Sequence, residues 1–276
     1  MSNKPGIVIP VDKPAGWSSF QVVNKLKWHI KRTFGLKKFK IGHAGTLDPL
    51  ASGLLLVCVG SATKRIEVLQ AGIKVYSGTM VLGATTPCYD LEQAIDAYYP
   101  VDGIDAASLE SARMQFVGNI EQVPPMFSAV KVDGQRAYVS ARDGETAKIA
   151  PKTVTVYDFE ITAYRPGYQA SSVCSHTPPH VPSSPIAERH LYRNPQGSVP
   201  EHLPQLDFCI TCSKGTYIRS IARDFGEALG SGAFLSALRR ERIGNYTLSD
   251  ALSIDDIETV ITSDNHAFSA LTMMQI

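Results

Sequence analysis

The sequence predicts an α+β fold built on a large mixed or antiparallel sheet. Strand-like and helix-like segments are interleaved irregularly, without the steady β-α-β alternation of a parallel sheet. Two well-formed strand-like segments, 153–164 and 206–212, are separated only by a polar segment, so we expect them to be neighbours in one sheet. With 276 residues and 44% hydrophobic content, the chain can bury a substantial core.

The first half of the chain begins with a strand and a helix. Residues 6–11 read as a strand ending at the turn Lys13-Pro14-Ala15-Gly16. Ser18 or Ser19 can cap a helix whose apolar residues recur at helical spacing. The sequence then predicts a buried strand at 53–59, a short helix at 62–69 and a strand at 74–82.

The second half continues with mixed elements. We expect helices at 108–116, 136–143 and 216–229, an extended segment at 122–131 around Pro124-Pro125, and strands at 153–164 and 206–212. Residues 166–204 contain eight of the seventeen prolines and four of the seven histidines, so we expect a mobile insertion. A metal site formed by its cysteine and histidines is an alternative, but their spacing matches no compact zinc pattern.

Charge is unevenly distributed along a chain whose net charge is only +1. Eight Lys or Arg residues and no acid lie between Lys13 and Leu47, whereas acids collect at 90–110 and after residue 250. A basic run of this kind forms either a solvated surface or a nucleic-acid-binding face. The N-terminus resembles no signal peptide, and the five cysteines are an odd number, so we expect a cytoplasmic protein with reduced thiols.

The most informative segment is the glycine-rich stretch 42–53, GHAGTLDPLASG. Asp48 is the first acid after thirty-five residues of positive potential. Loops rich in glycine allow close approach of the backbone to a ligand, and we expect these glycines to leave room for RNA. An isolated carboxylate in such a loop indicates a reactive group, although a structural turn or capping Asp is the alternative.

Five ordered segments resemble the TruB family of pseudouridine synthases. The catalytic motif of that family is similar to GHAGTLDPLASGLLLVCVGSATK at 42–64. The other four segments are VDKPAGWSS at 11–19, KVY with LGATT between 74 and 86, QVPPMFSAVKVDGQRAYVSARDG at 122–144, and CSKGTYIRSIARDFGEALGSGAFLSALRR at 212–240. The resemblance covers about residues 6–250, apart from the insertion.

The resemblance implies a pseudouridine synthase fold, in which helices flank the sheet and an active-site cleft crosses it. It implies isomerisation of uridine to pseudouridine at position 55 in the T loop of tRNA, without a cofactor or metal. The implied partner is the T arm of tRNA, with no guide RNA and no membrane, and we expect a monomer. The domain expectation is a catalytic domain over 1–255 and a short tail over 256–276, without the RNA-binding PUA domain that most relatives carry.

Three catalytic residues follow from the resemblance. Asp48 matches the nucleophile, a role that a carboxylate can fill in breaking and remaking a glycosidic bond. Whether it attacks the sugar, attacks the base or assists elimination to a glycal stays open. Arg219 matches the arginine that pairs with this acid. Tyr76 matches the active-site tyrosine, expected to stack on the target base and to be a candidate base for the proton on C5, with core packing as the alternative.

The resemblance also implies substrate-binding residues. Leu238 matches an apolar residue of the pocket, and a plain core leucine is the alternative. His43 matches a residue that fills the space vacated by the flipped base. Asp90 is retained beside a loop, Pro87-Cys88-Tyr89, that departs from the family pattern. Basic positions expected to contact the RNA backbone are Lys13, Lys64 and Lys131.

Two other functions are compatible with these residues. A binding protein that has lost catalysis would keep the basic surface, but the joint retention of Asp48, Tyr76 and Arg219 argues against it. A synthase with a ribosomal or messenger RNA target would keep the same chemistry. Mapping pseudouridine in RNA distinguishes all three.

Overall fold

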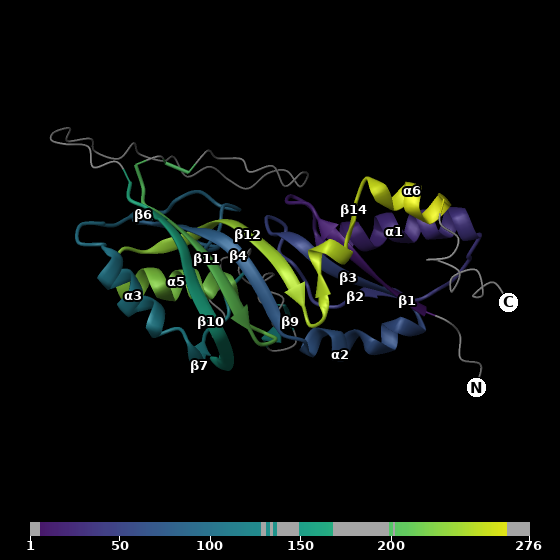
Figure 1. The fold of residues 1–276 in the computed structure, drawn as a ribbon, viewed down its shortest axis with the longest axis horizontal. Helices are drawn as coiled ribbons and strands as arrows, with labels where there is room; N and C mark the ends of the chain where they lie inside the picture. The colour runs from purple at the N-terminus through teal and green to yellow at the C-terminus, as the bar shows by residue number, and fades with distance from the viewer. Residues whose placement is uncertain are drawn as a thin grey trace.

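A ten-stranded mixed sheet forms the centre of the protein (Figure 1). The computed structural model describes residues 6–127, 131–132, 135–136, 149–167, 199–200 and 202–263. The strands of the main path run in the order β14-β1-β3-β12-β4-β11-β10-β7, with β2 paired to β3 and β13 paired to β12. Their bounds are β1 Gly6–Lys13, β2 Ile41–His43, β3 Ser52–Gly60, β4 Lys74–Leu82, β7 Gly118–Gln122, β10 Lys152–Arg165, β11 Gln205–Cys212, β12 Ala233–Ile243, β13 Tyr246–Thr247 and β14 Leu252–Ser253.

The pairing pattern confirms the predicted α+β class. β1 pairs with β14 and β12 pairs with β3 in parallel, whereas the remaining pairs are antiparallel. The expected neighbours β10 and β11 pair from Val156↔Cys212 to Arg165↔Gln205, which covers the whole of β11. Two small two-stranded sheets lie apart from the main one: β5 Ala84–Thr85 with β6 Ala97–Tyr98, and β8 Lys131–Val132 with β9 Gln135–Arg136.

Helices cover the two ends of the sheet separately (Figure 1). α3 (Ala106–Met114) and α5 (Ile218–Leu229) lie together at the end formed by β10 and β11, where Phe159 and Phe225 fill one core cluster. α1 (Ser19–Phe34) and α6 (Asp256–Ser263) lie at the end formed by β1 and β3, over a second cluster. The remaining helical turns are η1 (Ser61–Arg65), α2 (Ile66–Ala71) and η2 (Leu248–Asp250).

Helix α1 shows why these residues form a helix at this place. The Ser18 side chain accepts a hydrogen bond from the Gln21 N–H, and the Gln21 side-chain oxygen accepts one from the Ser18 N–H, which together form a capping box. Gly35 ends the helix in the left-handed conformation, with φ 62°. The buried face is lined by Val22, Val23, Leu26, Ile30 and Phe34. The predicted cap and helix are therefore confirmed, with Ser18 rather than Ser19 as the cap.

Most predicted strands lie within a few residues of their observed bounds, and one predicted helix is partly wrong. Arg136 was expected to begin a helix over 136–143, but it lies in β9. Residues 137–143 fall outside the described part of the chain, as does most of the insertion at 166–204. His202 is described and stacks on Tyr98 at 6.5 Å between ring centroids.

The stretch expected to be a tail after residue 255 begins with α6. Ile257 and Ile261 on this helix are fully buried in the core cluster that α1 covers. The packed domain therefore continues to Ser263, and residues 264–276 lie outside the described part.

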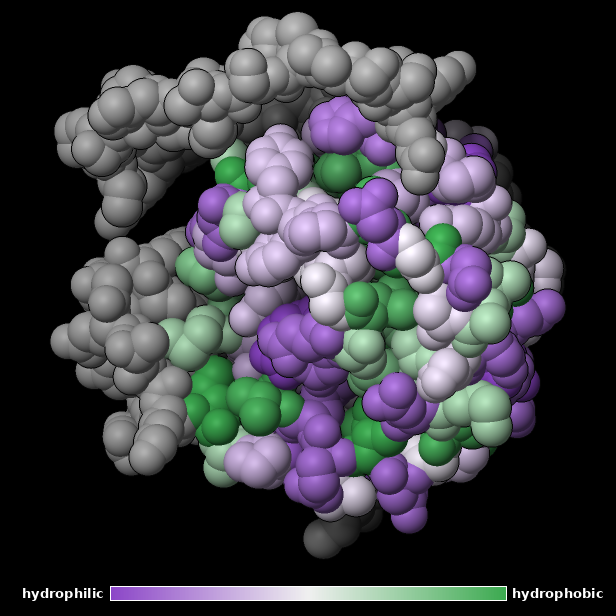
Figure 2. All heavy atoms as spheres, turned by 90° about the vertical axis from the view of Figure 1, so that its left-hand side faces the viewer, coloured by the Kyte–Doolittle hydropathy of each residue, from purple (hydrophilic) through white to green (hydrophobic). Residues whose placement is uncertain are grey.

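One end of the molecule carries both hydrophobic and hydrophilic side chains on its surface (Figure 2). The left-hand end of Figure 1, seen face-on in Figure 2, shows hydrophobic side chains in separate groups between hydrophilic ones. No helix in the described ranges is both long and apolar enough to cross a membrane. The cysteines at 58, 88, 209 and 212 are free thiols, and three of these four are buried.

Candidate active site

Asp48 lies in the segment between β2 and β3, which we call the Asp48 loop (residues 44–51). The loop leads into β3 at the place where β3 meets β12 in parallel, through Arg239↔Ser52 and Arg240↔Gly53. Gly53 has φ 101°, and a Cβ there would come within 2.4 Å of the Arg240 carbonyl oxygen. Only glycine permits this approach of the two strands. The loop is therefore held against the centre of the sheet.

The Arg240 side chain fixes the backbone of the Asp48 loop. It is only 1% exposed, and its guanidinium donates to three backbone carbonyls: Leu54 at 2.8 Å, Gly45 at 3.2 Å and Thr46 at 3.3 Å. These carbonyls lie on both sides of Asp48. A planar guanidinium with five donors suits this role better than an ammonium group would.

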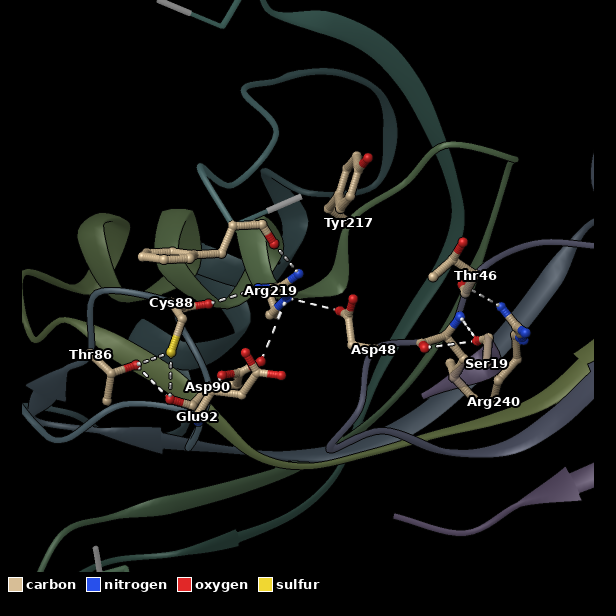
Figure 3. Close-up of polar contacts among 12 residues, drawn as sticks. Ser19, Thr46, Asp48, Thr86, Cys88, Asp90, Glu92, Tyr217, Arg219 and Arg240 are labelled. Carbon is tan, nitrogen blue, oxygen red and sulfur yellow. Dashed lines mark hydrogen bonds and ion pairs between the residues drawn. The ribbon is translucent and has the colours of Figure 1, made fainter. Parts of the chain in front are cut away.

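The segment between β1 and α1 holds the same loop from the other side. The Ser19 hydroxyl lies 2.9 Å from the Leu47 N–H and 3.0 Å from the Leu47 carbonyl oxygen, so that it can bond both. The Gly16 N–H donates to the Pro49 carbonyl at 2.8 Å, and the Lys13 ammonium donates to the same carbonyl at 3.2 Å. Leu47, on one side of Asp48, is thus fixed by Ser19 at the start of α1 (Figure 3). Pro49, on the other side, is fixed by the end of β1 and the turn after it.

Arg219 joins Asp48 to the rest of the site. It lies in the first turn of α5, is 4% exposed, and donates from Nε to Asp48 Oδ2 at 2.9 Å. Its other nitrogens donate to the carbonyls of Cys88 at 3.2 Å and Phe127 at 2.9 Å (Figure 3). Burial disfavours its charge, but the Asp48 and Asp90 carboxylates more than compensate, so the pKa of Arg219 is raised. The orientation of the Asp48 carboxylate is set by a side chain that is itself fixed.

The loop after β5 places Asp90 behind Arg219. Asp90 is 5% exposed, lies 3.7 Å from Arg219 Nε, and accepts a hydrogen bond from the Glu92 N–H. Thr86 and Cys88 both donate to the Asp90 backbone carbonyl, which fixes the backbone of this loop. Burial raises the pKa of Asp90, and Arg219 opposes that shift. Asp90 therefore supports Arg219 rather than facing solvent.

The three predicted catalytic residues line one open cleft of about 490 Å³, which also takes in Leu238. A small extension of about 20 Å³ leads from Asp48 and Leu238 to Asp90. Among the described residues that line the large cleft, Asp48 is the one carboxylate, and its side chain is 34% exposed. The structure thus brings Asp48, Tyr76, Arg219 and Leu238 together, and their roles stay predictions.

Tyr76 lies on β4 directly opposite Arg240 on β12. The tyrosine is 9% exposed, and burial raises its pKa, with only partial opposition from Arg240. A phenol with a raised pKa stays protonated near neutral pH. Stacking on the target base and taking the proton from C5 both stay predictions for Tyr76.

His43 ends β2 close to the Asp48 loop. Its Nδ1 is buried and has no hydrogen-bond partner among the described residues. Burial and the Arg240 charge lower its pKa, so the imidazole is neutral at physiological pH. A neutral, flat ring is compatible with the predicted contact to RNA bases, and that contact stays a prediction.

The predicted basic contacts have three different outcomes. The prediction for Lys13 is wrong, because its side chain is 0% exposed and its ammonium donates to the carbonyls of Pro14, Trp17 and Pro49. Lys64 is exposed but lies beyond the end of β3 opposite to Asp48, roughly 27 Å along the nine-residue strand. The side chain of Lys131 lies outside the described residues.

The glycines of this stretch differ in their surroundings, and the expectation that they leave room for RNA stays a prediction. Gly53 is required by the approach of β12, as described above. Gly45 has φ 95° and exposes its carbonyl to Arg240. Gly42 lies in β2 with Ile66 3.2 Å from a Cβ position. Gly53 therefore serves the packing of two strands, whereas Gly45 lines the large cleft, where the nearest atom to a Cβ would be Arg240 Nη1 at 3.8 Å.

Comparison with known proteins supports the same reading. The model described as "TruB family pseudouridylate synthase (N terminal domain)" matches residues 31–176, and "tRNA pseudouridylate synthase B C-terminal domain" matches residues 219–274. A tRNA pseudouridine synthase B of Phocaeicola vulgatus is 45% identical over 92% of this chain and 93% of its own. One of Thermobifida fusca is 41% identical over 93% of this chain and 75% of its own.

Solved structures agree on the fold. In a Cbf5-Nop10-Gar1 complex, one chain matches 98% of this chain with a TM-score of 0.59 at 24% identity. An H/ACA RNP bound to a substrate RNA contains a chain that matches 97% of this one with a TM-score of 0.56 at 23% identity. This chain spans 59% and 58% of those longer chains. The family models and the relatives together show that the chain belongs to the TruB family of pseudouridylate synthases.

Proposed function

We propose that this protein isomerises uridine 55 in the T loop of tRNA to pseudouridine, with Asp48 as the nucleophile. The observation that carries the proposal is the convergence of Asp48, Arg219 and Tyr76 on one cleft, from a loop, a helix and a strand far apart in sequence. Relatives that match about nine-tenths of the chain are named tRNA pseudouridine synthase B, and this supports tRNA as the substrate.

The reaction needs few groups. The bond between ribose C1′ and uracil N1 breaks, the base turns, a bond forms between C1′ and C5, and the C5 proton leaves while N1 gains one. Atoms and electrons balance within the nucleotide, so no oxidant, cofactor or metal is required. A carboxylate can add covalently to an electrophilic centre in this sequence and leave again. Asp48 is the carboxylate that the large cleft offers among its described lining residues.

Arg219 and Tyr76 have separate roles in this proposal. Arg219 holds the Asp48 carboxylate by one hydrogen bond, while two backbone carbonyls fix the guanidinium itself. A preorganised nucleophile avoids the cost of being oriented during the reaction. Tyr76 is buried beside Arg240 and can stack on a uracil that has left the RNA stack. Leu238 supplies an apolar wall to the same cleft.

We also propose that the protein works in the cytoplasm, where tRNA is modified, as a monomer that needs no guide RNA. The large cleft and the ion pair between Asp48 and Arg219 are both formed by residues of a single chain, and this supports a monomer.

The test uses an unmodified elongator tRNA transcript and a matched transcript with cytidine at position 55. Incubation with the wild-type protein is expected to give one pseudouridine in the first transcript and none in the second, as mapped by mass spectrometry of nuclease fragments. Tight binding without any pseudouridine would instead indicate an RNA-binding protein. Product only in ribosomal or messenger RNA fragments would refute the choice of substrate.

A further inference from the structure

The large cleft extends past Tyr76 to three lysines that the proposed chemistry does not use. Lys74 begins β4, Lys152 begins β10, and Lys214 lies two residues after the end of β11. β11 lies between β4 and β10 and runs antiparallel to both. The start of β4, the start of β10 and the end of β11 therefore lie at the same end of these strands. Lys74 is directly opposite Cys212 in the register. We call these three residues the lysine cluster.

The charges of the cleft are unbalanced at this end. Five cations line it, and Asp48 is the one carboxylate among the described lining residues. Arg219 is paired with Asp48, and Arg240 is occupied by three carbonyls. Within the described part of the chain, no carboxylate forms a salt bridge with any member of the lysine cluster. The cluster is thus a concave cationic surface without its own counter-charge.

The burial of the Lys74 ammonium costs free energy in the protein without a bound ligand. The side chain is 6% exposed, and its ammonium donates one hydrogen bond, to the Gln70 carbonyl. Burial, together with the positive charges of Arg240 and Lys214, lowers its pKa to about 8, although Cys212 opposes this shift. A buried ammonium without an anionic partner is unfavourable, and a bound anion would relieve that cost.

The position of Lys74 indicates which anion fits. Lys74 and Tyr76 lie two residues apart on the same face of β4, about 7 Å along the strand. The distance is within the size of one nucleotide. A nucleotide whose base reaches Tyr76 would therefore carry its phosphate toward the lysine cluster.

We propose that the lysine cluster is a phosphate-binding subsite for the RNA backbone next to the nucleotide that enters the cleft. The inference rests on the proposed function, because it takes RNA as the ligand. Lys74 supplies a desolvated charge at the bottom of the subsite, and the exposed Lys152 and Lys214 supply charges at its rim. The rival explanation is structural, with Lys74 serving only to bond the last turn of α2 through Gln70.

The test measures binding of a synthetic T-arm hairpin in which the phosphates flanking nucleotide 55 are natural or are replaced by neutral methylphosphonates. Wild-type protein is expected to lose affinity when these phosphates are neutral. Lys74→Gln and Lys214→Gln are expected to bind the natural hairpin more weakly, and to be less sensitive to the replacement than wild type. Each of these two substitutions should also make the plot of log binding constant against log salt concentration less steep by about 0.7, the value for one phosphate contact on a single strand.

Arg165→Gln is the matched control. Arg165 ends the same strand that Lys152 begins, roughly 40 Å away, and it pairs with Asp207 at the surface. We expect this variant to keep the wild-type slope and the wild-type response to methylphosphonates. Lys74→Arg, which retains the charge, should keep most of the wild-type slope, whereas a purely structural role for Lys74 predicts the wild-type slope for Lys74→Gln as well.

Each outcome decides a different claim. Equal slopes and equal methylphosphonate responses for wild type, Lys74→Gln and Lys214→Gln would overturn the subsite, even if pseudouridine is made. A wild-type protein that shows the predicted phosphate dependence but makes no pseudouridine would overturn the proposed function and leave the subsite standing. Because Lys214 is exposed, its variant gives a result even if Lys74→Gln loosens α2.

Discussion

Arg219 is the side chain that holds the Asp48 carboxylate, and its geometry rather than its charge alone determines its effect. It donates to a carboxylate and to two carbonyls from a position that is 4% exposed. A lysine at this position keeps the charge but cannot make all three bonds, because its donors lie on a single nitrogen. The Asp48 carboxylate would then be free to rotate.

We therefore expect Arg219→Lys to lower the rate of pseudouridine formation by roughly 100-fold, the cost of a small misplacement of a reacting group. Affinity for tRNA should change by less than this factor. Single-turnover kinetics and a filter-binding titration measure the two quantities separately. An unchanged rate would show that orientation of Asp48 by Arg219 is unimportant.

The buried Lys13 side chain makes the free energy of unfolding depend on pH. Burial lowers its pKa from 10.5 to about 8 in the folded protein. Between these values the unfolded state binds more protons than the folded state, so the free energy of unfolding rises with pH across this window. Lys13→Met should remove up to about 1.4 kcal/mol per pH unit from that slope, the value for one proton. Urea unfolding at pH 8, 9 and 10 checks this, and a slope equal to that of wild type would contradict it.

The sequence could identify Asp48, Tyr76 and Arg219 but not Arg240. The three matched specific motifs, whereas Arg240 stands in LRRERI, a run that reads as solvated charge. It is buried because the two-residue period of β12 places it on the same face as Leu238, toward the cleft. The alternation could have indicated this, but only once the segment was known to be a strand.

At the scale of elements, the strands with continuous or alternating apolar residues were predictable, and β12 was not. β3 is buried over Gly53–Val59, and β4 has the predicted bounds 74–82. β12 carries two register irregularities against β4, between Leu235 and Ala237 and between Arg240 and Arg242, which interrupt its alternation. Its position between β3 and β4 depends on contacts distant in sequence, which no local pattern encodes.

Ser18 and Ser19 make a matched pair of adjacent hydroxyls with different functions. Ser18 caps α1 and faces solvent, whereas Ser19 is 3% exposed and bonds Leu47 next to Asp48. We expect Ser18→Ala to cost about 1 kcal/mol of stability with little change in turnover. Ser19→Ala should instead lower turnover by about tenfold or more, because it releases the Asp48 loop. Melting temperatures and single-turnover rates of both variants test this, and equal effects on turnover would contradict it.

At the scale of the whole molecule, the sheet brings the ends of the insertion together. Arg165 pairs with Gln205, so the chain leaves β10 and enters β11 at the same place. We expect replacement of residues 168–198 by a short Gly-Ser linker to leave turnover on tRNA within about twofold, because the joined strands need only a connecting loop. A loss of turnover with an unchanged melting temperature would show that the insertion takes part in the reaction.

The central claim is that Asp48, fixed by Arg219 and by the anchored loop around it, performs the chemistry on tRNA. Asp48→Asn tests it most directly, because the amide keeps the shape of the carboxylate and removes its nucleophilic charge. Single-turnover formation of pseudouridine in an unmodified tRNA transcript is expected to fall by roughly 10⁴-fold or more, while the Kd for the transcript stays close to wild type. A variant that forms pseudouridine at position 55 at a rate close to that of wild type would contradict the account.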